Sequence, residues 1–341
     1  MPGDWSREDN MSDVRKYETG SSQKQWNTLA TVANLYYNSG LTQNQIADMM
    51  YTSRSKISRM LSEARELGIV EIRINEPWDR NETYEHDIQR KFGMQTVRVI
   101  RQRVADDEEE ALKDISRATA FYLDSILKPG MTVGISWGTT LYHITRRIRE
   151  NNPKNIPVTV IPIMGAVMTG NPEKDSADLA KNLAVSYGGK YRYIYAPVYV
   201  QSREIRNSLL QDESISSTLE LARKADVILT SIGSAETESW GYRLGGEDRR
   251  KLIESGAIGH IAGHFYNIRG EQVSTEYDDR MVGLDLDEIS RCPNVICGAV
   301  GRKKALALIG AMNGRRIMTL IVDEECAEEI LRLSDGMKDT N

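Results

Sequence analysis

The strongest constraint on the fold is a series of short apolar segments that alternate with stretches long enough to form helices. A strand buried on both faces of a sheet is apolar along its whole length, and parallel strands need a long connection, usually a helix. The alternation therefore predicts an α/β fold with a mostly parallel, Rossmann-like sheet covered by helices on both faces. The expected strands are residues 132–135, 158–164, 191–200, 226–232, 282–286, 295–299 and 318–322.

The segment GISWGTT, residues 134–140, ends the first of these strands and leads into a helix expected over residues 141–149. Small molecules bind at the carboxyl ends of parallel strands, where helix N-termini present free N–H groups. Gly138 allows close approach to the backbone, and the hydroxyls of Ser136, Thr139 and Thr140 cluster beside it. The segment predicts a phosphate cradle, although an ordinary strand-to-helix turn would have the same pattern. It is neither a P-loop nor a dinucleotide fingerprint, because the lysine and the spacing differ.

Near the N-terminus the pattern changes to three helices, expected over residues 29–37, 43–50 and 54–67. Thr42 and Ser53 are the capping residues of the second and third helices. Two helices that cross near a right angle need a small residue at their closest approach and aliphatic residues around it, and Ala47 with Ile57 and Leu61 supplies both. Residues 69–74 alternate strictly and predict a strand. The pattern is typical of a winged helix-turn-helix.

The outer face of the third helix carries short hydroxyls and cations, the side chains that reach phosphates and guanine edges in a major groove. The predicted DNA-binding residues are Thr42, Gln43, Ser53, Arg54, Ser55, Lys56, Ser58 and Arg59, with Arg73 on the wing. Two other interpretations stay open. The helices could form a charged pair used for packing or dimerisation, or the module could bind a protein instead of DNA.

Charge and composition divide the chain in the same way. Residues 24–75 contain six lysines and arginines against four acids, a formal charge of +2, whereas the rest of the chain carries 38 against 45, or −7. The segment Glu76-Pro77-Trp78-Asp79 interrupts the pattern, which predicts a flexible tail over residues 1–25, a DNA-binding domain over 26–76 and an effector-binding, oligomerising domain over 77–341. The first 25 residues are polar, and no apolar run approaches the roughly 20 residues that cross a bilayer, so a cytoplasmic protein without membrane contact is expected.

From residue 29 to its end, the chain resembles the SorC/DeoR-type family of sugar-responsive bacterial transcriptional regulators. The matching segments are YYNSGLTQNQIADMMYTSRSKISRMLSEARELGIVEI, GISWGTT, YAPVYV, ADVILTSIG, GLDLDEI and GAVGRKKALALIGAMNG. The resemblance implies an effector domain similar to sugar-phosphate isomerases that has lost catalysis. It also implies three partners: operator DNA, a phosphorylated sugar or polyol as effector, and further copies of the chain in dimers or tetramers.

The resemblance also assigns residues to the effector site. Ser136, Gly138, Thr139 and Thr140 would hold the phosphate, with Lys304 near it, although Lys304 could also be a solvated lysine at a helix start. The remaining predicted effector-binding residues are Trp137, Gly165, Gly233, His260 and Asp285, of which the two glycines could equally be simple turns. His260 stands where the family often has an acid. The loop at Gly165 lacks an arginine that some members use for a second phosphate, so a bisphosphate is not expected.

Neither a metal nor a cofactor is predicted. His260 and His264 are four residues apart, but their segment alternates like a strand and lacks the glutamate of a zinc-binding helix. Cys292, Cys297 and Cys326 form neither a disulfide set nor a zinc pair and are expected to be buried. The alternative function is a sugar-phosphate isomerase or a Schiff-base aldolase on the same fold, which would need a general base such as Asp285 or Asp287 beside Lys304.

Overall fold

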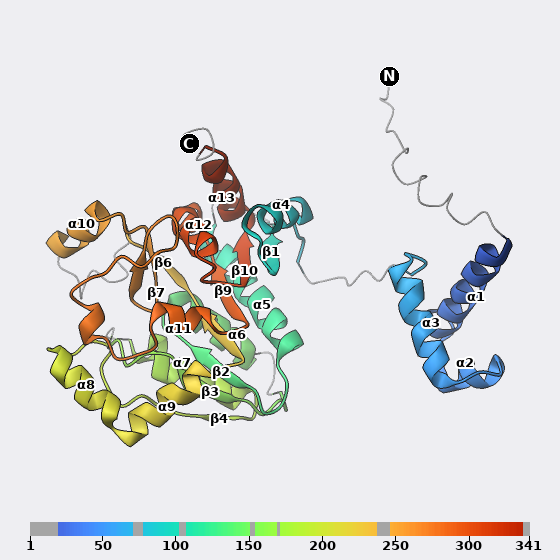
Figure 1. Cartoon of the computed structure of the whole chain (residues 1–341), viewed down its shortest axis with the longest axis horizontal. Helices are drawn as coiled ribbons and strands as arrows, with labels where there is room; N and C mark the ends of the chain where they lie inside the picture. Colours follow the sequence, from blue (N-terminus) through green and yellow to red (C-terminus); the bar gives the residue numbers. More distant parts are fainter. Residues whose placement is uncertain are drawn as a thin grey trace. The chain divides into compact units, whose positions relative to one another are not determined.

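The computed structural model describes residues 20–70, 78–101, 107–150, 154–168, 171–236 and 246–336. The chain divides into two compact units, Met1–Glu76 and Pro77–Asn341. Figure 1 shows the helices of the first unit in blue and the sheet of the second in cyan to red.

The first unit consists of the three expected helices, α1 (Gly20–Tyr37), α2 (Gln43–Met49) and α3 (Arg54–Glu66). The Thr42 side chain accepts a hydrogen bond from the Gln45 N–H while the Gln45 side chain bonds back to Thr42, which forms a capping box at the start of α2. Ser53 caps α3 through the Lys56 N–H. Helix α1 starts at Gly20, so residues 20–25 are helical where a tail was predicted.

A small core joins the three helices. Ile46, Ala47 and Ile57 are almost fully buried together with Val32 and Leu61, so the residues expected at the helix crossing do lie in its centre. The predicted strand over residues 69–74 is not formed at its start. The N–H groups of Ile69 and Val70 both bond to the carbonyl of Ala64 and fold back on α3. Residues 71–74, including Arg73, lie outside the described residues.

The second unit contains a seven-stranded sheet in the order β1-β10-β9-β5-β2-β3-β4, in which every neighbouring pair is parallel. Its strands are β1 (Thr96–Ile100), β2 (Thr132–Ile135), β3 (Thr159–Pro162), β4 (Lys190–Tyr191), β5 (Val227–Thr230), β9 (Val295–Ala299) and β10 (Thr319–Asp323). The mostly parallel sheet predicted from the apolar segments is confirmed. A separate antiparallel sheet is formed by β6 (Ile232–Ser234), β7 (Gly259–Ile261) and β8 (His264–Tyr266).

The strand order reverses between β2 and β5. From β2 the chain continues to β3 and β4 on one side, whereas from β5 it continues to β9 and β10 on the other. At such a reversal the two following connections leave the sheet toward opposite faces, and a crevice opens at the carboxyl ends of the two strands. The topology thus opens a crevice after Ile135 and after Thr230.

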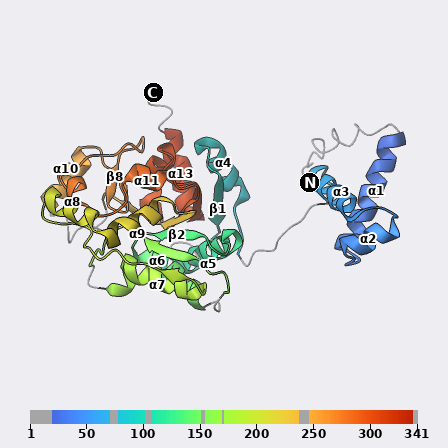
Figure 2. The ribbon, with the colours of Figure 1, turned by 60° about the horizontal axis from the view of Figure 1, so that its bottom comes forward.

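Helices cover both faces of the sheet, as Figure 2 shows. Helices α5 (Glu108–Ile126), α6 (Thr139–Glu150) and α7 (Ser176–Ser186) pack on one face, against Val227 and Leu229 of β5. The opposite face is covered by α4 (Glu82–Phe92), α9 (Glu213–Arg223), α11 (Leu286–Ser290), α12 (Ala305–Asn313) and α13 (Glu324–Gly336), against Ile228. Successive side chains of a strand point to opposite faces, which explains why each strand is apolar throughout.

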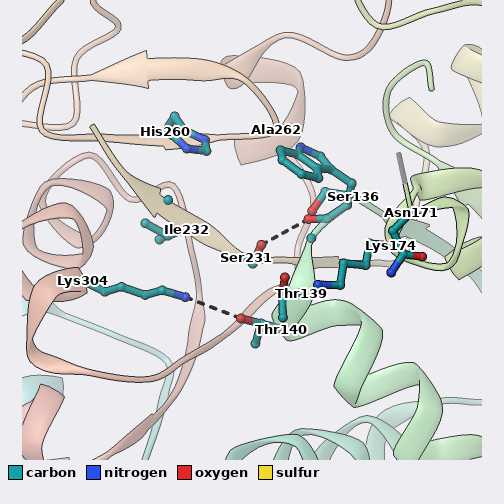
Figure 3. Close-up of a pocket in the computed structure, with 13 residues that line it drawn as sticks. Ser136, Thr139, Thr140, Asn171, Lys174, Ser231, Ile232, His260, Ala262 and Lys304 are labelled. Atoms are coloured by element: carbon teal, nitrogen blue, oxygen red, sulfur yellow. Dashed lines mark hydrogen bonds between the residues drawn. The ribbon is translucent and has the colours of Figure 1, made fainter. Parts of the chain in front are cut away.

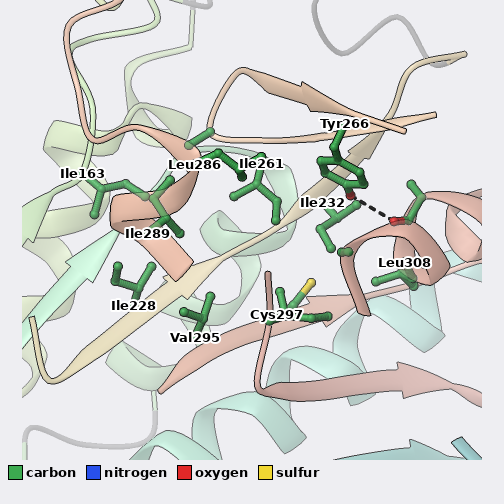
Figure 4. Packing of buried hydrophobic residues seen from close by; sticks show 14 of the residues in the cluster. Ile163, Ile228, Ile232, Ile261, Tyr266, Leu286, Ile289, Val295, Cys297 and Leu308 are labelled. Atoms are coloured by element: carbon green, nitrogen blue, oxygen red, sulfur yellow. Dashed lines mark hydrogen bonds between the residues drawn. The ribbon is translucent and has the colours of Figure 1, made fainter. Parts of the chain in front are cut away.

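Figure 4 shows the core on the face of the sheet that α12 covers, where Ile228, Val295 and Cys297 of the sheet meet Leu308 of α12 and Tyr266 of β8. The Tyr266 hydroxyl donates to the carbonyl of Ala307 at 3.0 Å and so is satisfied in its buried position. The three cysteines are free and buried, as expected. Helices α8 (Arg203–Gln211) and α10 (Gly246–Glu254) complete the described α-helices. No described helix is long and apolar enough to cross a membrane.

Three of the predicted strands are not formed as expected. Of residues 191–200 only Tyr191 belongs to β4, and the rest contacts other segments through isolated bridges such as Ala166 with Pro197. Residues 282–286 form no named strand, because Asp285 caps α11 with a capping box and turns the chain into a helix. The run 226–232 is split between β5 and β6, which belong to different sheets.

Candidate functional site

A cavity of about 370 Å³ lies at the reversal of strand order, at the carboxyl ends of β2 and β5. Figure 3 shows the cavity with its labelled side chains, which come from loops on both sides of the reversal. Its lining consists of Ser136, Trp137, Gly138, Thr139, Thr140, Asn171, Lys174, Ser231, Ile232, Gly233, His260, Ala262 and Lys304. Among these described residues there are two lysines and no carboxylate.

The segment from Ser136 to Thr140 forms one wall of this cavity. Helix α6 begins at Thr139, and the first N–H groups of a helix have no partner within the helix, so they are available to an anion. Gly138 has a φ of +127°, a conformation that favours glycine, and a side chain there would approach the Ser231 hydroxyl at 3.3 Å. The Gly138 N–H donates to the carbonyl of Lys174 at 3.2 Å. The turn has the geometry of an anion cradle.

Some of the hydroxyls around the cradle bond within the protein, whereas others remain for a ligand. Ser136 Oγ lies 3.1 Å from Thr230 Oγ1 in a buried contact that joins the ends of β2 and β5. Ser231 Oγ donates to the carbonyl of Trp137 at 3.3 Å and closes the turn from the other strand. Thr139 and Thr140 are therefore the hydroxyls best placed to serve a ligand.

Two lysines approach the cradle from opposite sides (Figure 3). Lys304 Nζ lies 3.5 Å from Thr140 Oγ1. Lys174 follows from the other side, and its amine points toward Thr139 in the same view. Each lysine is the last residue of a 3-10 turn, Arg302–Lys304 or Pro172–Lys174, which sets it just before a helix.

His260 forms a buried part of the cavity wall and lies on β7, next to Gly233 of the paired strand β6. Burial, together with the charge of Lys304, lowers the pKa of His260 to about 3, so the imidazole is neutral at ordinary pH. A Cβ on Gly233 would lie 2.0 Å from His260 Nε2. Gly233 is thus required by the imidazole that packs over it, which gives this glycine a role beyond a simple turn.

Two predicted effector-binding residues do not line the cavity. A side chain at Gly165 would lie 2.6 Å from the carbonyl of Ala196, so this glycine permits two backbone segments to pack together. The Asp285 carboxylate accepts the Glu288 N–H at 2.6 Å at the start of α11. Asp287, the other candidate base, bonds to Arg316 at 2.6 Å. Neither carboxylate expected of an isomerase or an aldolase lines this pocket.

Five lining residues escaped the sequence analysis: Asn171, Lys174, Ser231, Ile232 and Ala262. Ser231 had a usable signal, since it follows directly after an apolar strand whose end the topology brings beside Ser136. The turn with Asn171 and Lys174 had none, because it follows no periodic pattern and is brought to the pocket by the connection from β3 to α7.

The two histidines predicted not to bind a metal lie on opposite faces of the hairpin of β7 and β8. His260 is paired with Phe265, whereas His264 is paired with Ile261. Neighbouring positions of a strand point to opposite faces, so the two imidazoles diverge. His264 Nε2 lies 2.9 Å from the carbonyl of Leu284, and its Nδ1 lies 3.4 Å from the Asp278 carboxylate.

In the first unit, most of the predicted DNA-binding residues are exposed, and Arg73 lies outside the described residues. Side chains exposed to solvent are Thr42, Ser53, Arg54, Ser55, Lys56, Ser58 and Arg59, while Gln43 is half-buried. The opposite side of α3 carries the buried Ile57, Leu61 and Ala64. The helix therefore keeps its cations and hydroxyls free of the core.

The chain is similar to known transcriptional regulators along most of its length. Residues 77–332 match a domain family described as "Putative sugar-binding domain". The chain is 30% identical over 339 residues to the transcriptional regulator LsrR of an Enterobacter species, covering 95% of this chain and all of that protein. It is 28% identical to the deoxyribonucleoside regulator of Bacillus subtilis over 301 residues, which cover 88% of this chain and 95% of that one. The crystal structure of the full-length sorbitol operon regulator SorC from Klebsiella pneumoniae superposes with a TM-score of 0.70 at 28% identity, covering 89% of this chain and 98% of that chain.

Proposed function

Because this chain belongs to the SorC/DeoR-type family of bacterial transcriptional regulators with a sugar-binding domain, we propose that it binds operator DNA through α3 and a phosphorylated sugar or polyol in the pocket between β2 and β5. The relatives are named as regulators, and the isomerase or aldolase alternative has no support among them.

One observation carries the choice of ligand: the described lining residues include two lysines and no carboxylate, at the N-terminus of a helix. The helix N-terminus and the lysine amines all favour negative charge, and a phosphate accepts hydrogen bonds from each of them. The neutral His260, Trp137 and the apolar Ile232 and Ala262 leave room for the carbon skeleton of a sugar, whose hydroxyls can bond to the imidazole.

The phosphate site can be tested with a thermal-shift screen of sugar phosphates and their unphosphorylated parents. A ligand that binds only the folded state raises the melting temperature, so the phosphates should stabilise the protein and the parent sugars should not. The double variant Thr139→Ala/Thr140→Ala loses two hydroxyls that bond to a charged group, each worth about 1.5–3 kcal/mol. We expect this variant to lose the response to the ligand while its affinity for operator DNA without ligand stays unchanged.

A collapse of DNA affinity in the double variant would show instead that the turn is structural and that the effector binds elsewhere. Ser125→Ala is a matched control. It removes an exposed hydroxyl on α5 that bonds only to the carbonyl of Tyr122, outside the pocket lining, and should leave the ligand response intact.

The proposal for DNA rests on the exposed face of α3, which combines Arg54, Lys56 and Arg59 with the hydroxyls of Ser53, Ser55 and Ser58. Such a face fits a major groove, with the capped N-terminus of the helix directed to the bases and the phosphates. Thr42 and Gln43 would contact the backbone beside the groove, and Arg73 would do so from the wing. A gel-shift titration against the upstream region of the gene at several salt concentrations separates DNA binding from protein binding, because phosphate contacts weaken as salt rises.

We also propose that the chain acts as a dimer or tetramer. One recognition helix reads only a few base pairs, and a module with a formal charge of +2 binds weakly at physiological salt. Two modules joined by their larger domains would reach successive major grooves and gain affinity through effective concentration. Sedimentation at micromolar concentration would reveal the assembly.

A further inference from the structure

Lys174 belongs to none of the sequence motifs, yet it lines the cavity beside the proposed phosphate cradle. It lies at the end of the turn Pro172–Lys174, just before α7, and its carbonyl accepts the Gly138 N–H at 3.2 Å. This main-chain bond fixes the position of Lys174 relative to the start of α6. The side chain then extends along the cradle, with its amine toward Thr139 (Figure 3).

Lys304 and Lys174 lie in connections that follow strands on opposite sides of the reversal, and they face the cradle from two sides. Lys304 comes from the connection between β9 and α12, whereas Lys174 comes from the connection between β3 and α7. An anion at the N-terminus of α6 would lie between the two amines. The described lining offers no carboxylate to offset either charge.

The charges of both lysines extend to neighbouring imidazoles. The pKa of His143 is lowered by partial burial and next by the charge of Lys174. The pKa of His260 is lowered by burial and next by Lys304. Positive potential is therefore present on both sides of the cradle.

We propose that Lys174 is the second cation of the effector site and makes the pocket selective for a dianionic phosphate monoester over anions with one charge. This inference rests on the proposed phosphate site. A phosphate monoester carries about −1.5 to −2 charges at pH 7, which two amines neutralise, whereas a phosphodiester or a carboxylate carries one charge and leaves one amine uncompensated. In this way the pocket distinguishes a phosphorylated effector from sugar acids and diesters of similar size.

Methyl phosphate and dimethyl phosphate are suitable probes, because they share the phosphate group and differ by one negative charge and one methyl group. Binding to the full-length protein can be followed by tryptophan fluorescence, since Trp137 lines the pocket. At pH 8 the wild type should bind methyl phosphate at least about tenfold more tightly than dimethyl phosphate, the effect of one additional charge-assisted hydrogen bond. In Lys174→Met, affinity for methyl phosphate should fall about tenfold and that for dimethyl phosphate much less, so that the preference largely disappears.

Lys181→Met is the matched control, because it removes the same charge from an exposed position of α7 outside the pocket lining. It should keep the wild-type preference. Lys174→Gln provides a second test with a polar side chain, and circular dichroism verifies that each variant is folded. Lys174→Arg keeps the charge and should keep most of the preference.

The possible failures are distinguishable. If the wild type prefers methyl phosphate and both Lys174→Met and Lys174→Gln retain that preference, the role of Lys174 is refuted while the phosphate site stands. If the wild type binds neither probe, or if Thr139→Ala/Thr140→Ala binds methyl phosphate as the wild type does, the proposed phosphate site itself fails and the inference fails with it.

Discussion

Replacing Gly233 by alanine should disturb the pocket through one side chain, the imidazole of His260. The added Cβ would lie 2.0 Å from His260 Nε2 and 2.4 Å from Cε1. Ordinary carbon contacts lie at about 3.5–4.0 Å, so the two groups must separate by roughly 1.5 Å. The imidazole is buried, so it can separate from the added methyl group only by displacing its neighbours or by turning into the cavity that it lines.

An added methyl group in a packed interior usually costs about 1–3 kcal/mol. We therefore expect Gly233→Ala to lower the free energy of unfolding by that amount, measured by urea denaturation with an unchanged m-value. For a domain of this size each kcal/mol corresponds to about 2–4 °C in melting temperature. Gly336→Ala, at a position where an added Cβ meets nothing within 4 Å, is the matched control and should be neutral or slightly stabilising.

The cause can be isolated by a double-mutant cycle. If the clash with the imidazole is responsible, His260→Ala should absorb most of the cost of Gly233→Ala, with a coupling energy above about 1 kcal/mol. Gly233→Ala with wild-type stability, or strictly additive effects in the double variant, would refute the idea that Gly233 exists to accommodate His260.

Three further predictions concern DNA, pH and assembly. Arg54→Ala should weaken operator binding by about 1–3 kcal/mol in fluorescence anisotropy and weaken binding to random DNA much less. Arg65→Ala, at the far end of α3, should affect neither affinity. An equal loss on both DNAs would show that Arg54 contacts only phosphate. Burial, with a contribution from Lys304, lowers the pKa of His260 to about 3. Below pH 6.5 the unfolded chain therefore binds a proton that the folded protein does not. The free energy of unfolding should fall as the pH drops from 6.5 toward 3. His260→Asn should reduce this slope by up to about 1.4 kcal/mol per pH unit in urea denaturation, and parallel profiles of the two proteins would contradict it. The fragment of residues 1–75 should bind operator DNA at least about a hundredfold more weakly than the full chain, and equal affinities together with a monomeric full chain in sedimentation would argue against assembly.

The sequence was informative wherever one segment determines its own environment. The run 132–135 could be predicted as a strand because Val133, Gly134 and Ile135 are buried, and the Gly138-Thr139 pair that follows is a local signal for a turn into a helix. Capping residues such as Thr42 and Ser53 are equally local, since each bonds to a backbone N–H three residues away.

The predictions failed where a distant segment decides the outcome. Residues 226–232 form one apolar run, yet Ser231 separates β5 of the large sheet from β6 of the small one, because β7 offers a second edge for pairing. Gly165 was expected beside the ligand, but its lack of a side chain serves the backbone at Ala196. Lys174 reaches the pocket through a main-chain bond to Gly138, a contact that no local pattern encodes.

The contact between Lys304 and Thr140 joins residues 164 positions apart in the chain. Strand β9 lies between β5 and β10 in the sheet, so Lys304 reaches the cradle only once β9 has been added beside β5. A chain that is still being synthesised, or one cut short before residue 295, already contains α1 to α3 but lacks half of the cationic pair. Such a product would keep the helices proposed to bind DNA and would lack the complete cradle proposed to bind the effector. The order of these elements therefore means that the cradle is completed only after β9 and the turn that follows it have been made.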